Sequence, residues 1–331
     1  MATKVRTKGK SSSTTVKQEE VLTKYIDLMT DFGFKRIFGE DANKDLLIDF
    51  LNAALNIDGG IKKLEYGNPE KQGRIKTDRK VIFDLYCITK KGERIIVEMQ
   101  KLPQTYYKER TLYYASFLIH EQGEKRKRWN YNLCPVYVVN VLNFKFKEED
   151  STNRKSKKSE EGLVQKYVSR IKLMDEDTKK VFYKKLIFVY IELPNFTKTI
   201  DELENNFERW MYVLQHIHKM DEIPATLLQN KIFKKIFELA KVANMTRAEI
   251  NAYNRSLKNK RSMNMVKMEM RERDRALAIA NRALATANKT LAQHVNAIAQ
   301  KDNAIAQQGN TISAMEKEIA EYRRLLGLKQ Q

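Results

Sequence analysis

With 331 residues, 42% of them apolar, the chain has room for one sizeable domain with a hydrophobic core and for accessory parts. Its 62 basic and 42 acidic residues leave a formal net charge of +20, which favours a polyanionic partner, nucleic acid or an acidic membrane surface, over a solvated basic surface without a partner. The chain has two cysteines, too few for a disulfide framework, and these and its four histidines lack the spacing of zinc ligands. No apolar run approaches the length of a membrane span.

The first part of the chain combines a polar arm, a helix and a short strand. Residues 1–20 are rich in Lys, Ser and Thr, and we expect them to form a disordered basic arm. Residues 43–56 carry leucine and phenylalanine at helical spacing, which predicts a helix. Residues 61–67 are expected to form a strand, and the polar residues 67–80 a loop.

Two strand-like runs come next, residues 81–88 and 94–100, joined by a tight-turn signal at 89–93. Each run is largely apolar but carries one acid in its interior, Asp84 in the first and Glu98 in the second. An ionised carboxylate in an apolar strand is costly unless something pairs with it. These two acids are therefore the most informative residues of the sequence.

The turn decides whether the two acids meet. In a three-residue loop, Gly92 takes the left-handed conformation and Thr89 pairs with Glu93. Counting back from that pair, Asp84 lies opposite Glu98, with Cβ atoms about 5 Å apart. Two carboxylates at that distance repel each other unless a cation lies between them or one takes a proton. A two-residue loop would shift the pairing by one residue and separate the acids onto different faces.

In the first register, Asp84 and Glu98 are suited to a hard divalent cation such as Mg²⁺, with Mn²⁺ as a substitute. Such a metal activates a water molecule and polarises a phosphodiester. Alternation puts Gln100 on the face of Glu98, where it would orient the water or a phosphate oxygen. The opposite face is predicted to be apolar: Val81, Phe83, Leu85, Cys87, Ile95, Val97 and Met99. The alternative is that both acids lie on the solvent face of a half-exposed hairpin.

A helix is predicted over residues 105–123, in which Arg110 and Tyr114, four residues apart, share one face. This pair faces the active site or the phosphate backbone, or else forms an ordinary Arg–carboxylate pair with a packed tyrosine. The basic run that follows is typical of a nucleic-acid backbone contact or of solvated surface. It consists of Lys125, Arg126, Lys127 and Arg128, next to Trp129.

Two further runs, residues 133–144 and 186–193, are predicted to be strands, and the charged segment 145–162 between them a mobile excursion. Cys87 and Cys134 both lie in apolar strand-like runs, which indicates buried free thiols in a reducing compartment. The rest of this part has a helical pattern, over 201–219, 225–244 and 246–258.

The last segment repeats an apolar residue at every seventh position. The repeat consists of Leu277, Leu284, Leu291, Ile298, Ile305, Ile312, Ile319 and Leu326. Eight consecutive matches predict a coiled coil over residues 263–328 that joins copies of the chain, although the second core position is poor in apolar residues. The alternative is a helix that folds back onto its own domain.

Five short segments, in this order, carry a resemblance to a known family. They are residues 30–39, 83–85, 97–100, the trio Tyr107, Arg110 and Tyr114, and residues 191–196. Together they resemble the core of the PD-(D/E)xK nuclease superfamily, and more specifically the bacterial PD-(D/E)xK nuclease family transposases, akin to recombination-promoting nucleases. The resemblance implies an α/β fold with a restriction-endonuclease-like core, in which a central mixed sheet is flanked by helices.

The implied organisation has four parts. A basic arm at 1–20 precedes a nuclease-like domain at 21–200. A helical accessory region at 201–262 and the coiled coil at 263–328 follow.

The resemblance also implies a metal-dependent DNA endonuclease linked to transposition or recombination, with Asp84 and Glu98 as metal ligands. Gln100 takes the place of the superfamily's lysine. A glutamine brings no positive charge to the transition state, so another residue is expected to supply it.

Three basic residues are candidates for that charge: Lys35, Lys101 and Arg110. Alternation points Lys101 to the face opposite Glu98, unless the strand ends before it. Asp31 is either a third acid of the site or a helix cap, and we favour the cap.

Two other functions compete with the nuclease. One is a catalytically decayed DNA-binding oligomer on the same fold, and the other is a structural coiled-coil protein whose basic face binds RNA or a membrane. The basic N-terminus has no apolar h-region of a secretory signal. We expect DNA as the partner, no membrane association, and a cytoplasmic protein, with association to the nucleoid as one alternative.

Overall fold

A computed structural model of the protein describes residues 23–71, 81–123, 130–146 and 166–326. Its strands are β1 (Leu64–Tyr66), β2 (Glu70–Lys71), β3 (Val81–Ile82), β4 (Leu85–Thr89), β5 (Arg94–Gln100), β6 (Val136–Leu142), β7 (Val168–Met174) and β8 (Val181–Glu192). Its helices are α1 (Asp31–Phe38), α2 (Lys44–Leu55), α3 (Tyr107–His120), α4 (Asn206–His216), α5 (Ala225–Leu228), α6 (Lys231–Ala240) and α7 (Arg247–Leu325). Short 3-10 turns lie at Asp41–Asn43, Leu193–Asn195, Ile200–Glu202, Ile217–Lys219 and Val242–Asn244.

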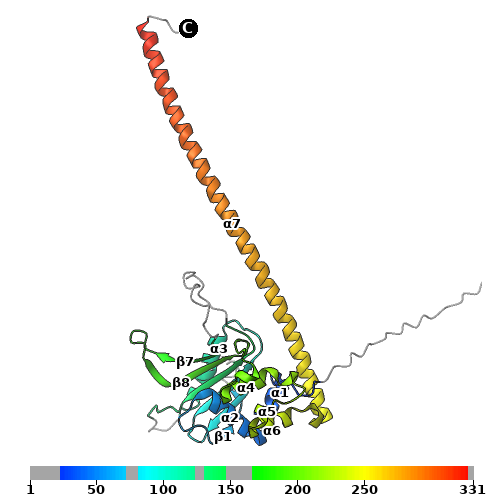
Figure 1. The fold of residues 1–331 in the computed structure, drawn as a ribbon. Coiled ribbons are helices and arrows are strands. Elements are labelled where there is room, and N and C mark those ends of the chain that lie inside the picture. The colour runs from blue at the N-terminus through cyan, green and yellow to red at the C-terminus, as the bar shows by residue number, and fades with distance from the viewer. Residues whose placement is uncertain (1–22, 72–80, 124–129, 147–165, 327–331) are drawn as a thin grey trace, which may run out of the picture. The chain divides into compact units, whose positions relative to one another are not determined.

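Six strands form one mixed sheet in the order β1-β4-β5-β6-β8-β7 (Figure 1). β5, β6 and β8 run parallel in its middle, while β1 and β4 on one side and β7 on the other pair antiparallel with their neighbours. β2 and β3 form a separate two-stranded ribbon. This architecture confirms the predicted fold class, an α/β protein with a central mixed sheet flanked by helices.

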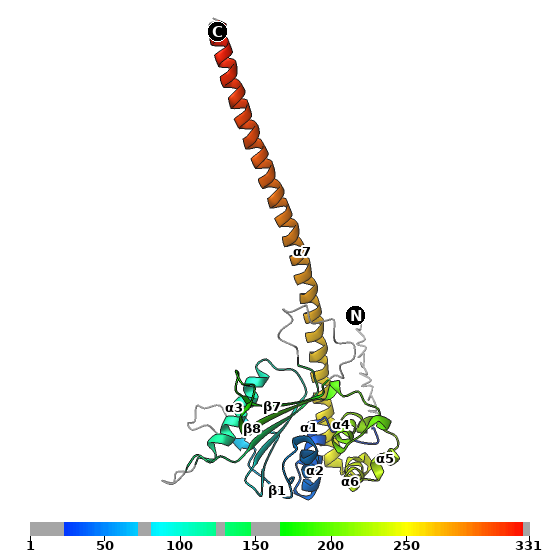
Figure 2. The ribbon, with the colours of Figure 1, turned by 60° about the vertical axis from the view of Figure 1, so that its left-hand side comes forward.

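Helices cover both faces of the sheet, as Figure 2 shows. On one face, Tyr114 and Leu118 of α3 pack with Ile96 and other sheet residues. On the other face, α1, α2, α4 and α6 pack against the side chains that surround Val97. Because both faces are buried, the central strands are apolar almost throughout. A polar residue inside them, such as Glu98, therefore needs a specific partner.

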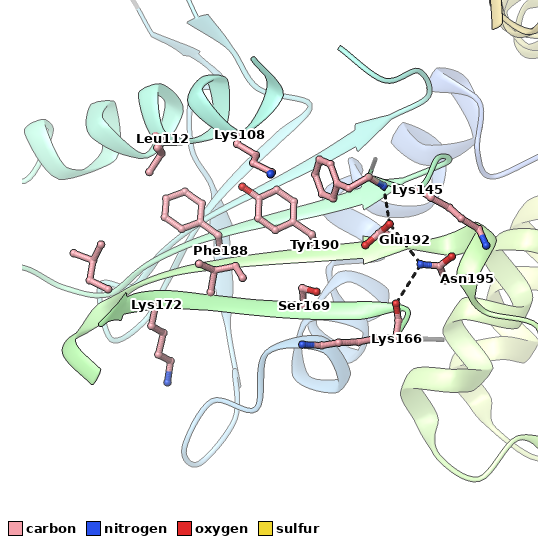
Figure 3. A pocket seen from close by; sticks show the side chains of 13 residues that line it. Lys108, Leu112, Lys145, Lys166, Ser169, Lys172, Phe188, Tyr190, Glu192 and Asn195 are labelled. Atoms are coloured by element: carbon pink, nitrogen blue, oxygen red, sulfur yellow. Dashed lines mark hydrogen bonds between the residues drawn. The ribbon is translucent and has the colours of Figure 1, made fainter. Parts of the chain in front are cut away.

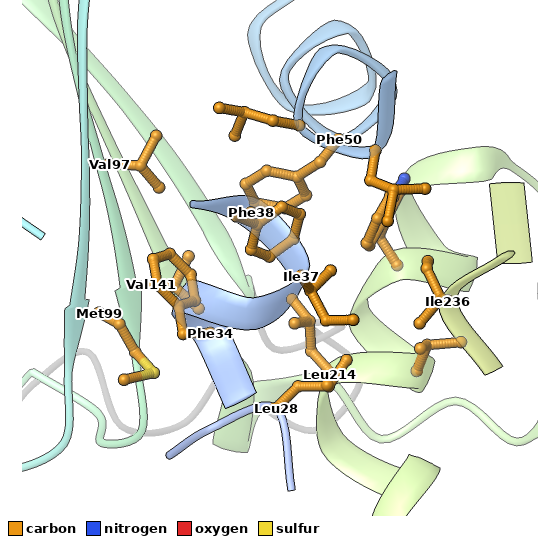
Figure 4. Close-up of a cluster of buried hydrophobic side chains, with 14 of the residues drawn as sticks. Leu28, Phe34, Ile37, Phe38, Phe50, Val97, Met99, Val141, Leu214 and Ile236 are labelled. Carbon is orange, nitrogen blue, oxygen red and sulfur yellow. The ribbon is translucent and has the colours of Figure 1, made fainter. Parts of the chain in front are cut away.

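The core on the second face is built around α1. Phe34, Ile37 and Phe38 are at most 1% exposed, and Figure 4 shows them between Val97 of the sheet and Leu214 of α4. Burying one large apolar side chain contributes about 1.5–3 kcal/mol. Packing is therefore the main role of these residues.

The start of α1 is fixed by a cap and by a close backbone approach. The N–H of Gly33 donates to the Thr30 hydroxyl over 3.0 Å, so Thr30 is the cap and Asp31 the first helical residue. The prediction that Asp31 caps this helix is therefore wrong. A Cβ atom on Gly33 would lie 2.3 Å from the carbonyl oxygen of Asp27, which only a glycine avoids.

The hairpin of β4 and β5 has the predicted three-residue loop. Gly92 has a φ of 81°, and the N–H of Thr89 donates to the carbonyl of Glu93 over 2.9 Å. The pairing continues without a shift to Leu85, which lies opposite Val97. The register predicted from the loop is confirmed over this whole ladder.

At the two acids the ladder ends. One further step in the same register brings Asp84 opposite Glu98, but the backbone bends there. The N–H of Phe83 donates to the carbonyl of Pro69 over 2.9 Å, and the N–H of Met99 donates to the carboxylate of Asp84 over 2.8 Å. A side-chain acceptor thus takes the place of a ladder bond.

The bend corrects two predictions. Residues 81–88 do not form one strand but two, β3 and β4, which belong to different sheets. Val81 and Phe83 do not join the apolar face with Leu85, because the bend turns them toward α3, where they pack with Tyr86. Ile82, which strict alternation would place on the face of the acids, is 59% exposed.

Most other predicted elements are present. The edge strand β7 was not predicted, because its apolar residues Val168, Ile171, Leu173 and Met174 do not alternate with polar ones. β8 begins five residues before the predicted strand at 186–193, and the two helical stretches at 246–258 and 263–328 are one continuous helix, α7, as far as Leu325. The arm at 1–20 and most of the segment 145–162 lie outside the described residues.

The chain divides into two units, Met1–Met263 and Asn264–Gln331. The helices of the predicted accessory region contribute to the same core as the sheet, with Trp210 and Phe233 fully buried. Cys87 is a buried free thiol, whereas Cys134 is only half-buried, which corrects the prediction for the second cysteine. In the described part of the chain, no helix combines the length and the apolar character that crossing a membrane requires.

Candidate metal site

Asp84 and Glu98 lie at the centre of the site. Glu98 is near the carboxyl end of β5 and is 3% exposed, while Asp84 is at the bend before β4. The N–H of Asp84 donates to Oε1 of Glu98 over 3.1 Å, and the N–H of Met99 donates to Oδ2 of Asp84. The Glu98 carboxylate thus accepts from the backbone of Asp84, and the Asp84 carboxylate accepts from the backbone of the residue after Glu98. These two bonds hold the carboxylates close together.

Both carboxyl groups are harder to ionise than usual. Burial raises the pKa of Glu98 to about 8, and the charge of Asp84 adds to the rise. Burial also raises the pKa of Asp84, against the lowering effect of the hydrogen bond from Met99. Two acids that repel each other in a buried position are suited to a bound cation, which would favour the ionised form of both.

Arg110 and Tyr114 of α3 face this pair. Nη2 of Arg110 lies 3.4 Å from Oε2 of Glu98, and its Nε donates to the hydroxyl of Tyr114 over 2.7 Å. Nη1 donates to Gln104 over 2.7 Å. The sequence left two alternatives for Arg110 and Tyr114: a pair that faces the candidate site, or an ordinary Arg–carboxylate pair with a packed tyrosine. Both descriptions apply, because the carboxylate that Arg110 contacts is that of Glu98.

Asp31, Lys35 and Lys101 approach the acids from the side of α1. All three line one cavity of about 810 Å³, and Lys35 lies 3.3 Å from Asp31. Their charges reach the pair, since Asp31 raises and Lys35 lowers the pKa of Asp84. β5 ends at Gln100, so strand alternation does not fix the direction of Lys101. Burial lowers the pKa of Lys101, while the charge of Asp31 opposes this.

Gln100 closes β5 and is half-buried. Its Nε2 donates to the carbonyl of Leu102 over 2.9 Å, which ties the amide to the loop after the strand. Its expected role in orienting a water molecule or a phosphate oxygen stays a prediction.

The donor set fits a hard divalent cation. Among the described residues, no group of three or more His, Cys, Asp or Glu side chains is placed to hold a metal. Asp84 and Glu98 alone would supply carboxylate oxygens. Mg²⁺ is commonly bound by one or two carboxylates and keeps water or substrate phosphate as its other ligands.

A buried polar residue that the sequence analysis did not single out lies next to Glu98. Asn140 of β6 pairs with Glu98 in the parallel ladder and is fully buried. It accepts a hydrogen bond from the hydroxyl of Tyr107 over 2.8 Å, which fastens the start of α3 over the sheet. Its position inside an apolar run was the same signal that pointed to the two acids.

The run Lys125, Arg126, Lys127 and Arg128 lies outside the described residues, so its predicted contact with a nucleic-acid backbone stays a prediction.

A family model described as PD-(D/E)XK nuclease family transposase matches residues 28–270, a span that includes the acids, α1 and α3. No curated relative and no solved structure matches the chain.

Proposed function

The chain belongs to the PD-(D/E)XK nuclease family transposases, and from this premise we propose that it is a metal-dependent DNA endonuclease in which Asp84 and Glu98 hold the metal. The observation that carries the proposal is the pairing of a buried carboxylate, Glu98, with a half-buried one, Asp84, through reciprocal backbone hydrogen bonds. Leaving both acids ionised without a cation is unfavourable there, because burial raises the pKa of each.

Mg²⁺, or Mn²⁺ in its place, would supply an activated water and a polarised phosphate oxygen. Asp84 and Glu98 hold the site at the carboxyl end of β5, and their backbone hydrogen bonds fix the direction of both carboxylates. Gln100 lies two residues beyond Glu98 and orients the water or the phosphate.

Arg110 supplies the positive charge that Gln100 lacks. Of the three basic candidates, it alone has a contact with an acid of the pair among the described residues, at 3.4 Å from Glu98. Its planar guanidinium is suited to a phosphate with two hydrogen bonds. Lys101 and Lys35 flank the pair on the side of α1 and attract the DNA backbone.

We also propose that the chain forms a homo-oligomer through the heptad repeat of α7. Its apolar residues are exposed in the single chain, with Leu277 at 60% and Ile305 at 65%. A row of exposed Leu and Ile residues seven apart over eight repeats is typical of a coiled-coil seam.

Nicking of supercoiled plasmid DNA, with and without Mg²⁺, tests the function. We expect metal-dependent nicking by the unmodified protein and its loss in Asp84→Asn and Glu98→Gln. Glu65→Gln is the matched control, because Glu65 is an exposed strand acid on β1 outside the site. Full activity in either site variant would refute the assignment.

The alternative is a decayed DNA-binding oligomer, favoured by the glutamine in place of the superfamily's lysine. It predicts DNA binding without nicking, and no heat of Mg²⁺ or Mn²⁺ binding that depends on Asp84.

A further inference from the structure

A second cavity lies on the α3 face of the sheet, away from the acids. It has a volume of about 760 Å³ and is bordered by α3, the edge strand β7, its neighbour β8, and the segments before β7 and after β6 (Figure 3). Its size is within the range of about 300–1,000 Å³ that holds small organic ligands.

The sheet register ties this cavity to the acid pair. Glu98 of β5 pairs with Asn140 of β6, Asn140 pairs with Tyr190 of β8, and Tyr190 pairs with Ser169 of β7. Tyr190 and Ser169 line the cavity. Neighbouring strands are about 4.8 Å apart, so the cavity begins two strands, or about 10 Å, from Glu98 along one row of the same face.

The lining is basic. Lys108 of α3, Lys145 after β6 and Lys166 before β7 are exposed lysines from three separate segments, and all three line the cavity. Among the described residues of the lining the one acid is Glu192, whose Oε2 accepts hydrogen bonds from the N–H of Phe146, at 2.8 Å, and from Nδ2 of Asn195, at 3.5 Å. The cavity therefore offers positive charge from several sides and attracts an anion.

The floor is aromatic. Figure 3 shows the rings of Phe188 and Tyr190 below Lys108. Phe146 is half-buried and meets the ring of Tyr190 edge to face, with centroids 5.4 Å apart. Nζ of Lys108 lies 5.5 Å from the centroid of the Phe146 ring. Lysines around aromatic rings are the combination that binds single-stranded nucleic acid, because phosphates pair with the lysines and bases stack on the rings.

We propose that this cavity binds an unpaired nucleotide of the DNA substrate, a few nucleotides from the phosphate that is cut, an inference that rests on the proposed nuclease function. A concave pocket admits one base and its phosphate, whereas a base-paired duplex contacts phosphates on an open surface. At about 3.4 Å per nucleotide along a stacked strand, the distance of about 10 Å corresponds to about three nucleotides. The substrate class is therefore DNA with a single-stranded or distorted stretch beside the cleavage site.

Fluorescence anisotropy with a labelled 12-nucleotide oligothymidylate and a 12-base-pair duplex, both in EDTA, tests the proposal on the full chain. The test variant is Lys108→Glu with Lys166→Glu. The matched control is Lys231→Glu with Lys234→Glu, which makes the same charge change at two exposed lysines of α6. Phe146→Leu removes the most accessible ring and leaves the charge unchanged.

We expect the test variant to bind the oligothymidylate at least about tenfold more weakly than the control. Its salt dependence should also fall by about 1.4 in the slope of log K against log salt, for two lost contacts to single-strand phosphates. Phe146→Leu should weaken single-strand binding about fivefold or more and leave duplex binding unchanged.

Equal effects of the test and control pairs would overturn the proposal. An equal loss of duplex and single-strand affinity in the test variant would also overturn it, because the lysines would then contact the phosphates of duplex DNA. Plasmid nicking distinguishes failure of the cavity proposal from failure of the nuclease proposal. Mg²⁺-dependent nicking without the expected binding changes refutes only the proposal that the cavity binds an unpaired nucleotide. The expected binding changes without any nicking refute the nuclease function and leave a single-strand site.

Discussion

Replacing Glu98 by Gln should stabilise the metal-free protein at alkaline pH. The pKa of Glu98 rises from 4.5 to about 8 on folding, so between these values the folded state holds one proton more than the unfolded state. Stability therefore falls as pH rises through this window, and it is fully present only below the lower value. At 1.36 kcal/mol for each pKa unit, the loss reaches about 5 kcal/mol. Glu98→Gln has no carboxyl proton to lose, so its free energy of unfolding does not include this loss.

Urea denaturation in EDTA at pH 5 and pH 9, followed by circular dichroism, measures this effect. Because pH 5 already lies above the lower pKa, the free energy of unfolding of the unmodified protein should fall between the two pH values by about 4 kcal/mol more than that of Glu98→Gln. At pH 9, Mg²⁺ at about 100 times its Kd should return about 2.7 kcal/mol to the unmodified protein and nothing to the variant. Parallel pH profiles for the two proteins would refute the inference that burial in the metal-free protein raises the pKa of Glu98.

Three further predictions concern Arg110, the core and the long helix. Arg110→Gln should slow plasmid nicking about 10²–10³-fold, as for the loss of one donor to a developing charge, with Arg110→Lys recovering part of the rate; an unchanged rate would exclude Arg110 as the source of charge. Gly33→Ala should lower the urea midpoint, because its Cβ would lie 2.3 Å from a backbone oxygen, whereas Gly309→Ala, with nothing within 4 Å, should be neutral or stabilising by up to about 1 kcal/mol. Leu291→Asp with Ile298→Asp should reduce the oligomeric state in analytical ultracentrifugation, and an unchanged mass would contradict the coiled coil.

The local part of the site could be predicted from the sequence. Gly92 set the loop length, the loop set the register, and the register placed Asp84 opposite Glu98, because each of these steps depends only on neighbouring residues. The prediction was wrong where the two acids themselves interfered. Their carboxylates accept backbone hydrogen bonds, and the strand that looked continuous bends at Asp84.

The long-range part of the site could not be predicted from one sequence. The approach of Lys101 and Asp31 to Asp84 depends on how α1 packs beneath the end of β5, for which residue spacing has no signal. The basic cavity depends on the edge strand β7, whose apolar residues do not alternate with polar ones in the sequence. Asn140 is the exception, because a polar residue inside an apolar strand is a signal that the sequence itself contains.

Isothermal titration calorimetry of Mn²⁺ or Mg²⁺ into the full chain measures whether Asp84 and Glu98 together form a metal site. We expect a binding heat in the unmodified protein and in Glu65→Gln that disappears in both Asp84→Asn and Glu98→Gln. A binding heat of the same size in either site variant would contradict it.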